Sequence, residues 1–267
     1  MRKIAVAIAH KEALPDAFVV FRGFEENIPL AADLGYNGVE LALRRADEIN
    51  AKKIGKLLAK ANMEVSAIST GQIYAENGLN LMDTDKSRRE TLFKVFFELI
   101  DLANDFGKKV NIGRVRGSLT KGDEKNCREL FDEGIEKVCG YALTRNVDIL
   151  LEPVNRYEIN FINNLSEAGD LIERLQIPNL YMMPDIFHMN IEDSIIENEL
   201  LKYKERIKYV HFADSNRLAP GWGHINFKSV LNTLEIMQYD GWHTIEILPK
   251  PSPFEAANYA INYLKNL

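Results

Sequence analysis

Along this 267-residue chain, short apolar runs rich in β-branched residues alternate with longer segments in which apolar residues recur at spacings of three and four. The pattern predicts strands that alternate with helices. Such alternation implies parallel strands joined by right-handed crossovers, and eight units in a chain of roughly 250 residues are typical of a closed barrel. We therefore predict an α/β fold, a single-domain (β/α)8 TIM barrel over residues 1–267, with strands at Lys3–Ala9, Gly38–Leu43, Glu64–Ser69, Lys109–Gly113, Val147–Glu152, Leu180–Asp185, Ile207–Asp214 and Thr244–Leu248.

The helical segments carry apolar stripes, of which the clearest run from Leu92 to Ala103 and from Cys127 to Ala142. The competing fold is a doubly wound open sheet. That fold usually carries a glycine-rich phosphate loop after an early strand, and neither G-x-G-x-x-G nor G-x-x-x-x-G-K-[ST] occurs in this sequence. No segment rich in Pro, Gly or Ser suggests a linker to a second domain, so the barrel is favoured.

Charge and cysteine placement exclude several classes of protein. Lys and Arg number 33 against 39 Asp and Glu, a net charge of −6, whereas proteins that bind nucleic acid or anionic membranes present a basic face. No apolar run approaches the ~20 residues that cross a bilayer, and the first residues are typical of a strand rather than a signal peptide. Cys127 and Cys139 fall in one predicted helix about 18 Å apart, too far for a disulfide. These features predict a reduced, cytoplasmic protein.

Polar residues end four consecutive strands in the second half of the chain. They are Glu152, Asp185, His211 and Glu246. Catalytic groups of such barrels lie at the carboxyl ends of the strands, so we expect the four side chains to converge. Three buried carboxylates repel one another and need protons, cationic partners or a shared metal ion. Three oxygen ligands and one imidazole suit Mn²⁺, our first choice, or Mg²⁺ or Co²⁺.

Each of the four residues also has a structural interpretation. Glu152 can pair with Arg156, and Asp185 can be a turn residue after a proline. His211 can be a hydrogen-bonded core histidine, and Glu246 can form an ion pair at the surface. All four assignments depend on the register of the barrel strands.

Longer motifs surround these positions, at Glu152–Glu158 (EPVNRYE), Pro184–Glu192 (PDIFHMNIE), His211–Phe227 (HFADSNRLAPGWGHINF) and Ile245–Pro249 (IEILP). They resemble the sugar isomerases and epimerases of the xylose-isomerase-like barrel family, most closely its ketose 3-epimerase branch. In the first half, STGQIY, NGLNL and GRVRG are more similar to epimerases that act on keto sugar acids than to those that act on neutral sugars. The resemblance covers the whole chain and is dense from Glu152 onward.

The resemblance implies an isomerase that depends on a divalent metal. Glu152 and Glu246 would be metal ligands, with the aspartate and histidine named above, and also the two proton-transfer groups. One would remove the proton next to a ketone and the other would return a proton to the opposite face, through a metal-stabilised enediolate. His188 and Arg217 would contact the carbonyl and hydroxyl end of the substrate, supported by Glu158. The family also implies a homo-oligomer, a dimer or a tetramer.

Arginines distinguish the possible substrates. A neutral ketose needs hydroxyl-pairing groups at its far end, whereas a sugar acid needs a cation, and a guanidinium binds a carboxylate through two parallel hydrogen bonds. Arg114 and Arg116 follow the fourth predicted strand, and strand parity lets only one of them face the site. Gln72 after the third strand and His10 after the first are further substrate-binding candidates. We expect a small-molecule sugar substrate and, from the arginines, a keto sugar acid.

Other activities share this scaffold. A neutral ketose 3-epimerase would differ only at the far end of the pocket. An aldose–ketose isomerase such as hydroxypyruvate isomerase would move the proton between adjacent carbons, and a dehydratase of inositol catabolism would expel water after the same proton abstraction. A three-zinc abasic-site endonuclease needs a richer set of histidine ligands across the barrel and a positive surface for DNA. Here only His211 of the five histidines falls at a predicted strand end, and the net charge is −6. A binding protein without activity would be expected to lack one of the metal ligands.

Overall fold

Eight parallel strands surround the centre of the computed structural model, which describes residues 2–15 and 17–267. They pair in the order β7-β6-β5-β4-β3-β1-β9-β8, and bridges from Met182 to Ile207 and from Asp185 to His211 close the ring. The predicted (β/α)8 TIM barrel is confirmed. The strands are β1 (Lys3–Ala9), β3 (Gly38–Ala42), β4 (Glu64–Ser69), β5 (Lys109–Ile112), β6 (Asp148–Leu151), β7 (Leu180–Met182), β8 (Tyr209–Phe212) and β9 (Trp242–Ile245), and a short β2 (Phe21–Arg22) pairs with β1.

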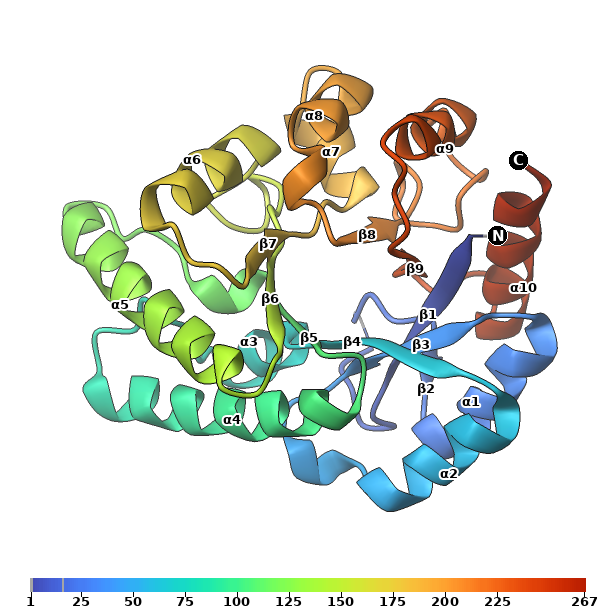
Figure 1. Ribbon diagram of the computed structural model, residues 1–267, viewed down its shortest axis with the longest axis horizontal. Coiled ribbons are helices and arrows are strands. Elements are labelled where there is room, and N and C mark those ends of the chain that lie inside the picture. Colours follow the sequence, from blue (N-terminus) through green and yellow to red (C-terminus); the bar gives the residue numbers. More distant parts are fainter. Residues whose placement is uncertain (1, 16) are drawn as a thin grey trace.

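Helices follow every strand of the ring and cover its outside (Figure 1). The predicted apolar stripes form buried faces, including Leu92 and Phe96 on α4 and Ile135 and Val138 on α5. The helices are α1 (Phe24–Leu34), α2 (Ala51–Ala61), α3 (Gly71–Asn77), α4 (Lys86–Asp105), α5 (Glu124–Leu143), α6 (Leu165–Leu175), α7 (Ile186–Glu192), α8 (Ile196–Lys202), α9 (Phe227–Ile236) and α10 (Pro253–Asn266), with 3-10 turns at Ala46–Glu48, Arg114–Arg116 and Lys204–Arg206.

Alternate residues of a barrel strand face opposite sides, and the described core has three parts. The largest part lies between the strands and the helices. A second part, the interior cluster, fills the barrel and consists of Ala5, Ala67, Leu150, Met183, Tyr209 and Trp242. A third part of small residues joins β1 and β3 to the loop after β1 and consists of Ala7, Ala9, Ala13, Ala17, Val19 and Ala42. Residues two positions further along the same strands share this inward direction, so the interior cluster fixes which side chains emerge at the barrel mouth.

Several strands end earlier than predicted. β6 stops at Leu151 and β7 at Met182, before Glu152 and Asp185. Pro153 and Pro184 follow closely, and a proline has no backbone N–H with which to continue a ladder. The polar residues therefore stand just beyond the strands, on the first residues of the loops.

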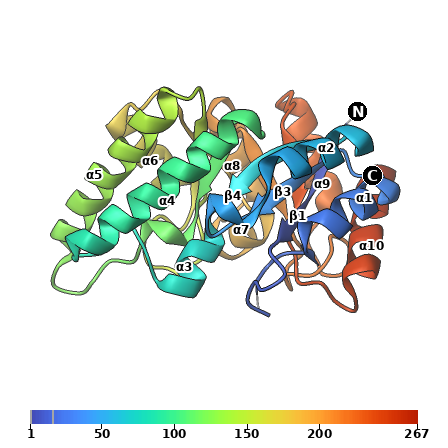
Figure 2. The same ribbon diagram turned by 90° about the horizontal axis from the view of Figure 1, so that it is seen from below.

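The remaining sequence predictions concern the cysteines and the chain ends. Cys127 and Cys139 are both buried in α5 and are free thiols. None of the helices in the described part of the chain is long and apolar enough to cross a membrane. The two ends of the chain meet beside α10, where Arg2 donates a hydrogen bond to the carbonyl of Leu264 at 3.0 Å (Figures 1 and 2).

Candidate metal centre and active site

The four predicted metal ligands converge at the carboxyl ends of β6 to β9. Glu152, Asp185, His211 and Glu246 each offer a ligand atom, and these atoms lie within 4.8 Å of one another. The interior cluster explains the convergence. Leu150, Met183 and Tyr209 point into the barrel, and the residue two positions beyond each of them is a member of the site. The prediction that these side chains meet is confirmed, whereas their binding of a metal stays a prediction.

Local contacts hold the aspartate and the histidine in place. Asp185 caps the N-terminus of α7, where one carboxylate oxygen accepts a hydrogen bond from the backbone N–H of Phe187 at 2.9 Å. His211 Nδ1 lies 3.3 Å from Glu152 Oε1 and 3.5 Å from Glu246 Oε2. Asp185 is thus a turn residue, as the structural interpretation supposed, and a member of the cluster as well.

Arg217 lies among the carboxylates rather than at the outer part of the pocket. Its guanidinium donates to Asp185 and to Glu246, and it lies over the rings of Phe18 and Phe187. The loop that carries Arg217 is folded around Asp214, whose buried carboxylate accepts hydrogen bonds from backbone N–H groups in that loop. The arginine therefore supplies positive charge to two of the predicted ligands and also lines the pocket.

Burial opposes the charged form of every carboxylate in the cluster, and the neighbouring cations decide the outcome. At Asp185 the charge of Arg217 outweighs burial, and the pKa falls to about 2. At Glu246 burial prevails over the charges of His211 and Arg217, and the pKa rises to about 8. Without further positive charge, the cluster does not keep all its carboxylates ionised at neutral pH.

The donor set fits a divalent cation. Three carboxylates and one imidazole gather in a buried position, and the cations already present do not balance their charge. Hard oxygen ligands with a single nitrogen are the chemistry of Mn²⁺, Mg²⁺ and Co²⁺ sites, whereas structural zinc sites are rich in thiolates. The residues that would hold the ion are Glu152, Asp185, His211 and Glu246.

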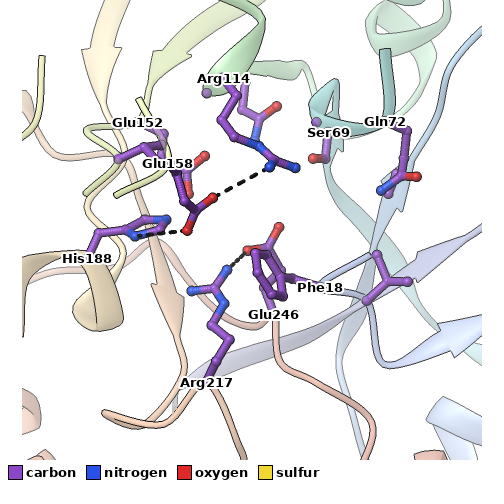
Figure 3. Close-up of a pocket in the computed structure, with 15 residues that line it drawn as sticks. Phe18, Ser69, Gln72, Arg114, Glu152, Glu158, His188, Arg217 and Glu246 are labelled. Carbon is purple, nitrogen blue, oxygen red and sulfur yellow. Dashed lines mark hydrogen bonds and ion pairs between the residues drawn. The ribbon is translucent and has the colours of Figure 1, made fainter. Parts of the chain in front are cut away.

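The pocket beside this cluster contains most of the predicted substrate-binding residues (Figure 3). His188 is buried next to the metal ligands, with Nε2 3.8 Å from Asp185 Oδ2, and Asn155 lies 2.8 Å from its Nδ1. Glu158 is 4.0 Å from the same imidazole and 3.6 Å from Arg114. The lining residues are Phe18, Val19, Ala42, Ser69, Gly71, Gln72, Asn111, Gly113, Arg114, Glu152, Val154, Glu158, His188, Arg217 and Glu246.

Gln72 and Arg114 lie at the part of the pocket away from Arg217 (Figure 3). Gln72 is 6% exposed, and within the described ranges its Oε1 has no hydrogen-bond partner. That oxygen is enclosed, and Gln72 lines the pocket through other atoms of its side chain. Arg114 is half-buried at the pocket wall, and its ion pair with Glu158 is long enough to leave other donors free.

Two of the candidate residues do not line the pocket. Arg116 is fully buried, and four of its five N–H groups donate to the backbone carbonyls of Gly113, Glu152, Phe161 and Ile162, so Arg114 is the one of the two arginines that lines the pocket. Arg116 ties the loop after β6 to the end of β5. His10 lies outside the pocket, where its Nδ1 is 3.1 Å from Arg44.

Two further contacts bear on the sequence predictions. Arg156 binds Glu192, with 2.7 Å between Nη2 and Oε2, rather than Glu152. Glu40, which the strand-end pattern does not single out, lies buried in β3 with its Oε2 2.8 Å from His211 Nε2. A lone carboxylate inside the apolar run Gly38–Leu43 is the signal that points to it.

Gly113 provides a test of how closely the pocket wall fits Glu152. A Cβ added at Gly113 would lie 2.6 Å from Glu152 Oε2, so Gly113→Ala displaces the carboxylate. Misplacing a reacting group by about 1 Å can cost ~10²-fold in rate, so if Glu152 transfers a proton as the sequence predicts, we expect a loss of that order in kcat. Gly140→Ala in α5 is the control, because its Cβ meets nothing within 4 Å. Steady-state kinetics in which both variants keep the parent rate would contradict this geometry.

Comparison with known proteins gives a consistent result. The family profile described as xylose isomerase-like TIM barrel matches residues 28–267. An L-ribulose 3-epimerase of Methylomonas sp. (strain DH-1) is 28% identical over 231 residues, which cover 84% of this chain and 78% of that protein. A ketose 3-epimerase of Arthrobacter globiformis is 36% identical over 185 residues, 66% of this chain and 64% of that protein.

Solved structures agree on the fold. A 3-keto-D-glucoside 4-epimerase from E. coli superposes on this chain with a TM-score of 0.83 at 19% identity, over the full length of both chains. A D-allulose 3-epimerase from Methylomonas sp., in complex with D-allulose, gives a TM-score of 0.81 at 22% identity and covers 99% of this chain and 97% of that one. At such low identity these matches show the shared barrel.

Proposed function

Since the chain belongs to the xylose isomerase-like TIM barrel family, we propose that it is a sugar epimerase that depends on a divalent metal and inverts the carbon next to a ketone. The observation that carries this proposal is the gathering of Glu152, Asp185, His211 and Glu246 within 4.8 Å at the barrel mouth, beside a pocket with polar walls. The names of the relatives, L-ribulose 3-epimerase and ketose 3-epimerase, support the same reaction class.

The placement of the two glutamates supports inversion by two proton-transfer groups. Glu152 follows β6 and Glu246 follows β9, so they enter the pocket from different parts of the barrel wall (Figure 3). One carboxylate removes the proton next to the ketone, and the other, in its acid form, donates a proton to the opposite face. The roles exchange in the reverse direction. When bound, Mn²⁺, Mg²⁺ or Co²⁺ supplies Lewis-acid stabilisation of the charge that develops on the substrate oxygens.

Two further side chains orient the substrate in this scheme. His188 and Arg217 lie beside the reacting glutamates and offer donors to the carbonyl and hydroxyl end of the sugar. Asn155 holds the imidazole of His188 through a contact of 2.8 Å with Nδ1, and Glu158 lines the pocket 4.0 Å from the same nitrogen. Gln72, which lines the pocket, binds a hydroxyl through its side-chain amide.

We propose a keto sugar acid such as 5-keto-L-gluconate as the substrate. Support comes from Arg114, whose guanidinium lines the pocket at a half-buried position suited to a carboxylate. The second candidate is a neutral ketose. It is favoured by the similarity to a ketose 3-epimerase and by Glu158, which lies 3.6 Å from Arg114 and offsets part of its charge.

Replacing Arg114 by Gln separates these two substrate classes. A hydrogen bond to a charged group is worth about 1.5–3 kcal/mol, so the variant should raise KM for 5-keto-L-gluconate roughly 10- to 100-fold and leave KM for neutral ketoses unchanged. Arg45→Gln is the matched control, because Arg45 is exposed and pairs with Asp47 away from the pocket. Equal changes in KM for acidic and neutral substrates would count against the keto-acid assignment.

A substrate panel tests the proposed reaction itself. Purified protein is incubated with 5-keto-L-gluconate, fructose, tagatose and hydroxypyruvate, with Mn²⁺ and again after chelation, and the products are identified by NMR. We expect a C-epimer as the product in Mn²⁺ only. An aldose, or loss of water, would instead indicate the isomerase or dehydratase activities that share the scaffold. Equal rates with and without the chelator would reject the metal-dependent mechanism.

Assembly as a homo-oligomer and a cytoplasmic location stay predictions.

A further inference from the structure

Glu40 is a buried carboxylate that the proposed mechanism leaves without a role. It lies at the middle of β3 and is 1% exposed. One oxygen, Oε2, lies 2.8 Å from His211 Nε2, and the other, Oε1, has no hydrogen-bond partner among the residues that the structure describes. Burying an ionised carboxylate away from water costs free energy, so we expect a carboxylate at this position to have a function.

The contact crosses the barrel. β3 and β8 are not neighbours in the ring, since β1 and β9 separate them. Glu40 therefore reaches His211 through the barrel interior, above Tyr209, whose hydroxyl is hydrogen-bonded to Ser66 at 2.6 Å and to Thr244 at 2.7 Å. Burial and the nearby charge of Glu40 raise the pKa of Tyr209, so this phenol also faces the carboxylate, beside the imidazole that lies 2.8 Å from Glu40 Oε2.

The two nitrogens of His211 face different surroundings. Nε2 faces Glu40, and Nδ1 faces Glu152 and Glu246 at 3.3 and 3.5 Å. A neutral imidazole has one N–H and one lone pair, and only the lone pair can bind a cation. His211 can therefore bind an ion held by the three carboxylates through Nδ1 only when its proton is on Nε2.

We propose that Glu40 is a positioning residue for the metal centre: by accepting a hydrogen bond from Nε2–H it holds His211 in the tautomer, and the orientation, that presents Nδ1 to the three carboxylates. The inference rests on the proposed metal site. It follows the general rule that the second nitrogen of a ligating histidine donates to a carboxylate, a carbonyl or water. Glu40 touches neither the substrate pocket nor the reacting atoms.

A purely structural role makes different predictions. If Glu40 served only as a buried ion-pair partner of a protonated His211, its loss would lower the stability of the protein and leave metal affinity unchanged. If it positions the ring, metal affinity falls even in a variant that is fully folded. The distinction requires a measurement of binding rather than of turnover.

The first experiment measures Mn²⁺ binding by EPR titration of the free ion, for Glu40→Gln and Glu40→Ala. Gln can donate as well as accept, so it no longer selects one tautomer, and Ala removes the partner altogether. We expect the dissociation constant to rise about 10- to 100-fold. Glu64→Gln is the control, because Glu64 lies on the neighbouring strand β4 but is exposed and pairs with Lys3. Dissociation constants within twofold of the parent, in variants that circular dichroism shows to be folded, would overturn the proposal.

The second experiment uses the unaltered protein, so it does not depend on how the variants fold. In protein with ¹⁵N-labelled histidine and saturating Mg²⁺, we expect Nε2 of His211 to carry the proton and Nδ1 to carry none. A proton on Nδ1 would overturn the inference. If the protein binds neither Mn²⁺ nor Mg²⁺, the proposed function fails together with it, whereas normal binding in the Glu40 variants rejects the role of Glu40 alone.

Discussion

Replacing Glu246 by Gln is expected to reduce kcat/KM for epimerisation on the order of 10²–10⁴-fold. The change keeps the size of the side chain and an oxygen that can face the cluster, but it removes the group that accepts or returns a proton. Because Glu152 remains, one of the two proton transfers is preserved. Steady-state rates on the substrate identified by the panel measure the loss.

Deuterium exchange makes this prediction more specific. In D₂O the Glu246→Gln enzyme should exchange the proton next to the ketone in one of the two epimers, through Glu152, without forming the other epimer. Glu152→Gln should show the opposite selectivity. Glu235→Gln is the control, since Glu235 is exposed on α9 and binds Arg2 far from the pocket. Exchange of both epimers by both variants would mean that a single base serves both faces, and the two-base scheme would be wrong.

Much of the proposed metal centre could be predicted because its members follow strands in a fixed parity. Leu150 and Glu152 are two residues apart, as are Tyr209 and His211, so each polar residue at the mouth points inward like the apolar core residue before it. An error of one residue in the register would have turned every one of these side chains toward the helices. The interior cluster shows that the predicted register is correct.

The contacts of Arg114 and Arg116 depend on the geometry of loops, which the spacing of apolar residues in the sequence does not predict. Arg114 and Arg116 lie in a single 3-10 turn rather than on a strand, so strand parity does not apply to them. Arg116 is buried because the loop after β6 turns back and presents the carbonyls of Phe161 and Ile162 to it. That return is a long-range contact, 45 residues away in sequence, and it leaves no local signal.

Glu40 was missed for a different reason. All five residues of β3 are buried, so its apolar neighbours give no indication of which alternate set faces the barrel interior. The role of Glu40 becomes visible only through its partner His211, which lies on β8, a strand distant from β3 both in sequence and in the ring. A lone acidic residue in a buried strand signals that a partner exists without identifying it.

Removing the metal is the second large effect that we expect. Treatment with EDTA should reduce the rate to background, and Mn²⁺, Co²⁺ or Mg²⁺ should restore it. Stability should change as well, because an ion that binds only the folded state at 100 times its dissociation constant stabilises that state by about 2.7 kcal/mol. At roughly 2–4 °C per kcal/mol for a domain of about this size, Tm should rise by roughly 5–10 °C when Mn²⁺ is added to the metal-free protein.

Asp185→Asn tests whether that shift arises at the proposed site. Asparagine caps a helix about as well as aspartate, so the hydrogen bond to Phe187 N–H and the start of α7 are preserved. The variant loses a charged metal ligand, and since Arg217 keeps its contact with Glu246, the fold around the pocket should persist without it. We therefore expect the Mn²⁺-dependent rise in Tm, followed by differential scanning fluorimetry, to be largely absent in Asp185→Asn. An undiminished rise would place the stabilising ion elsewhere on the protein, and the charge imbalance around Glu246 would then need another explanation.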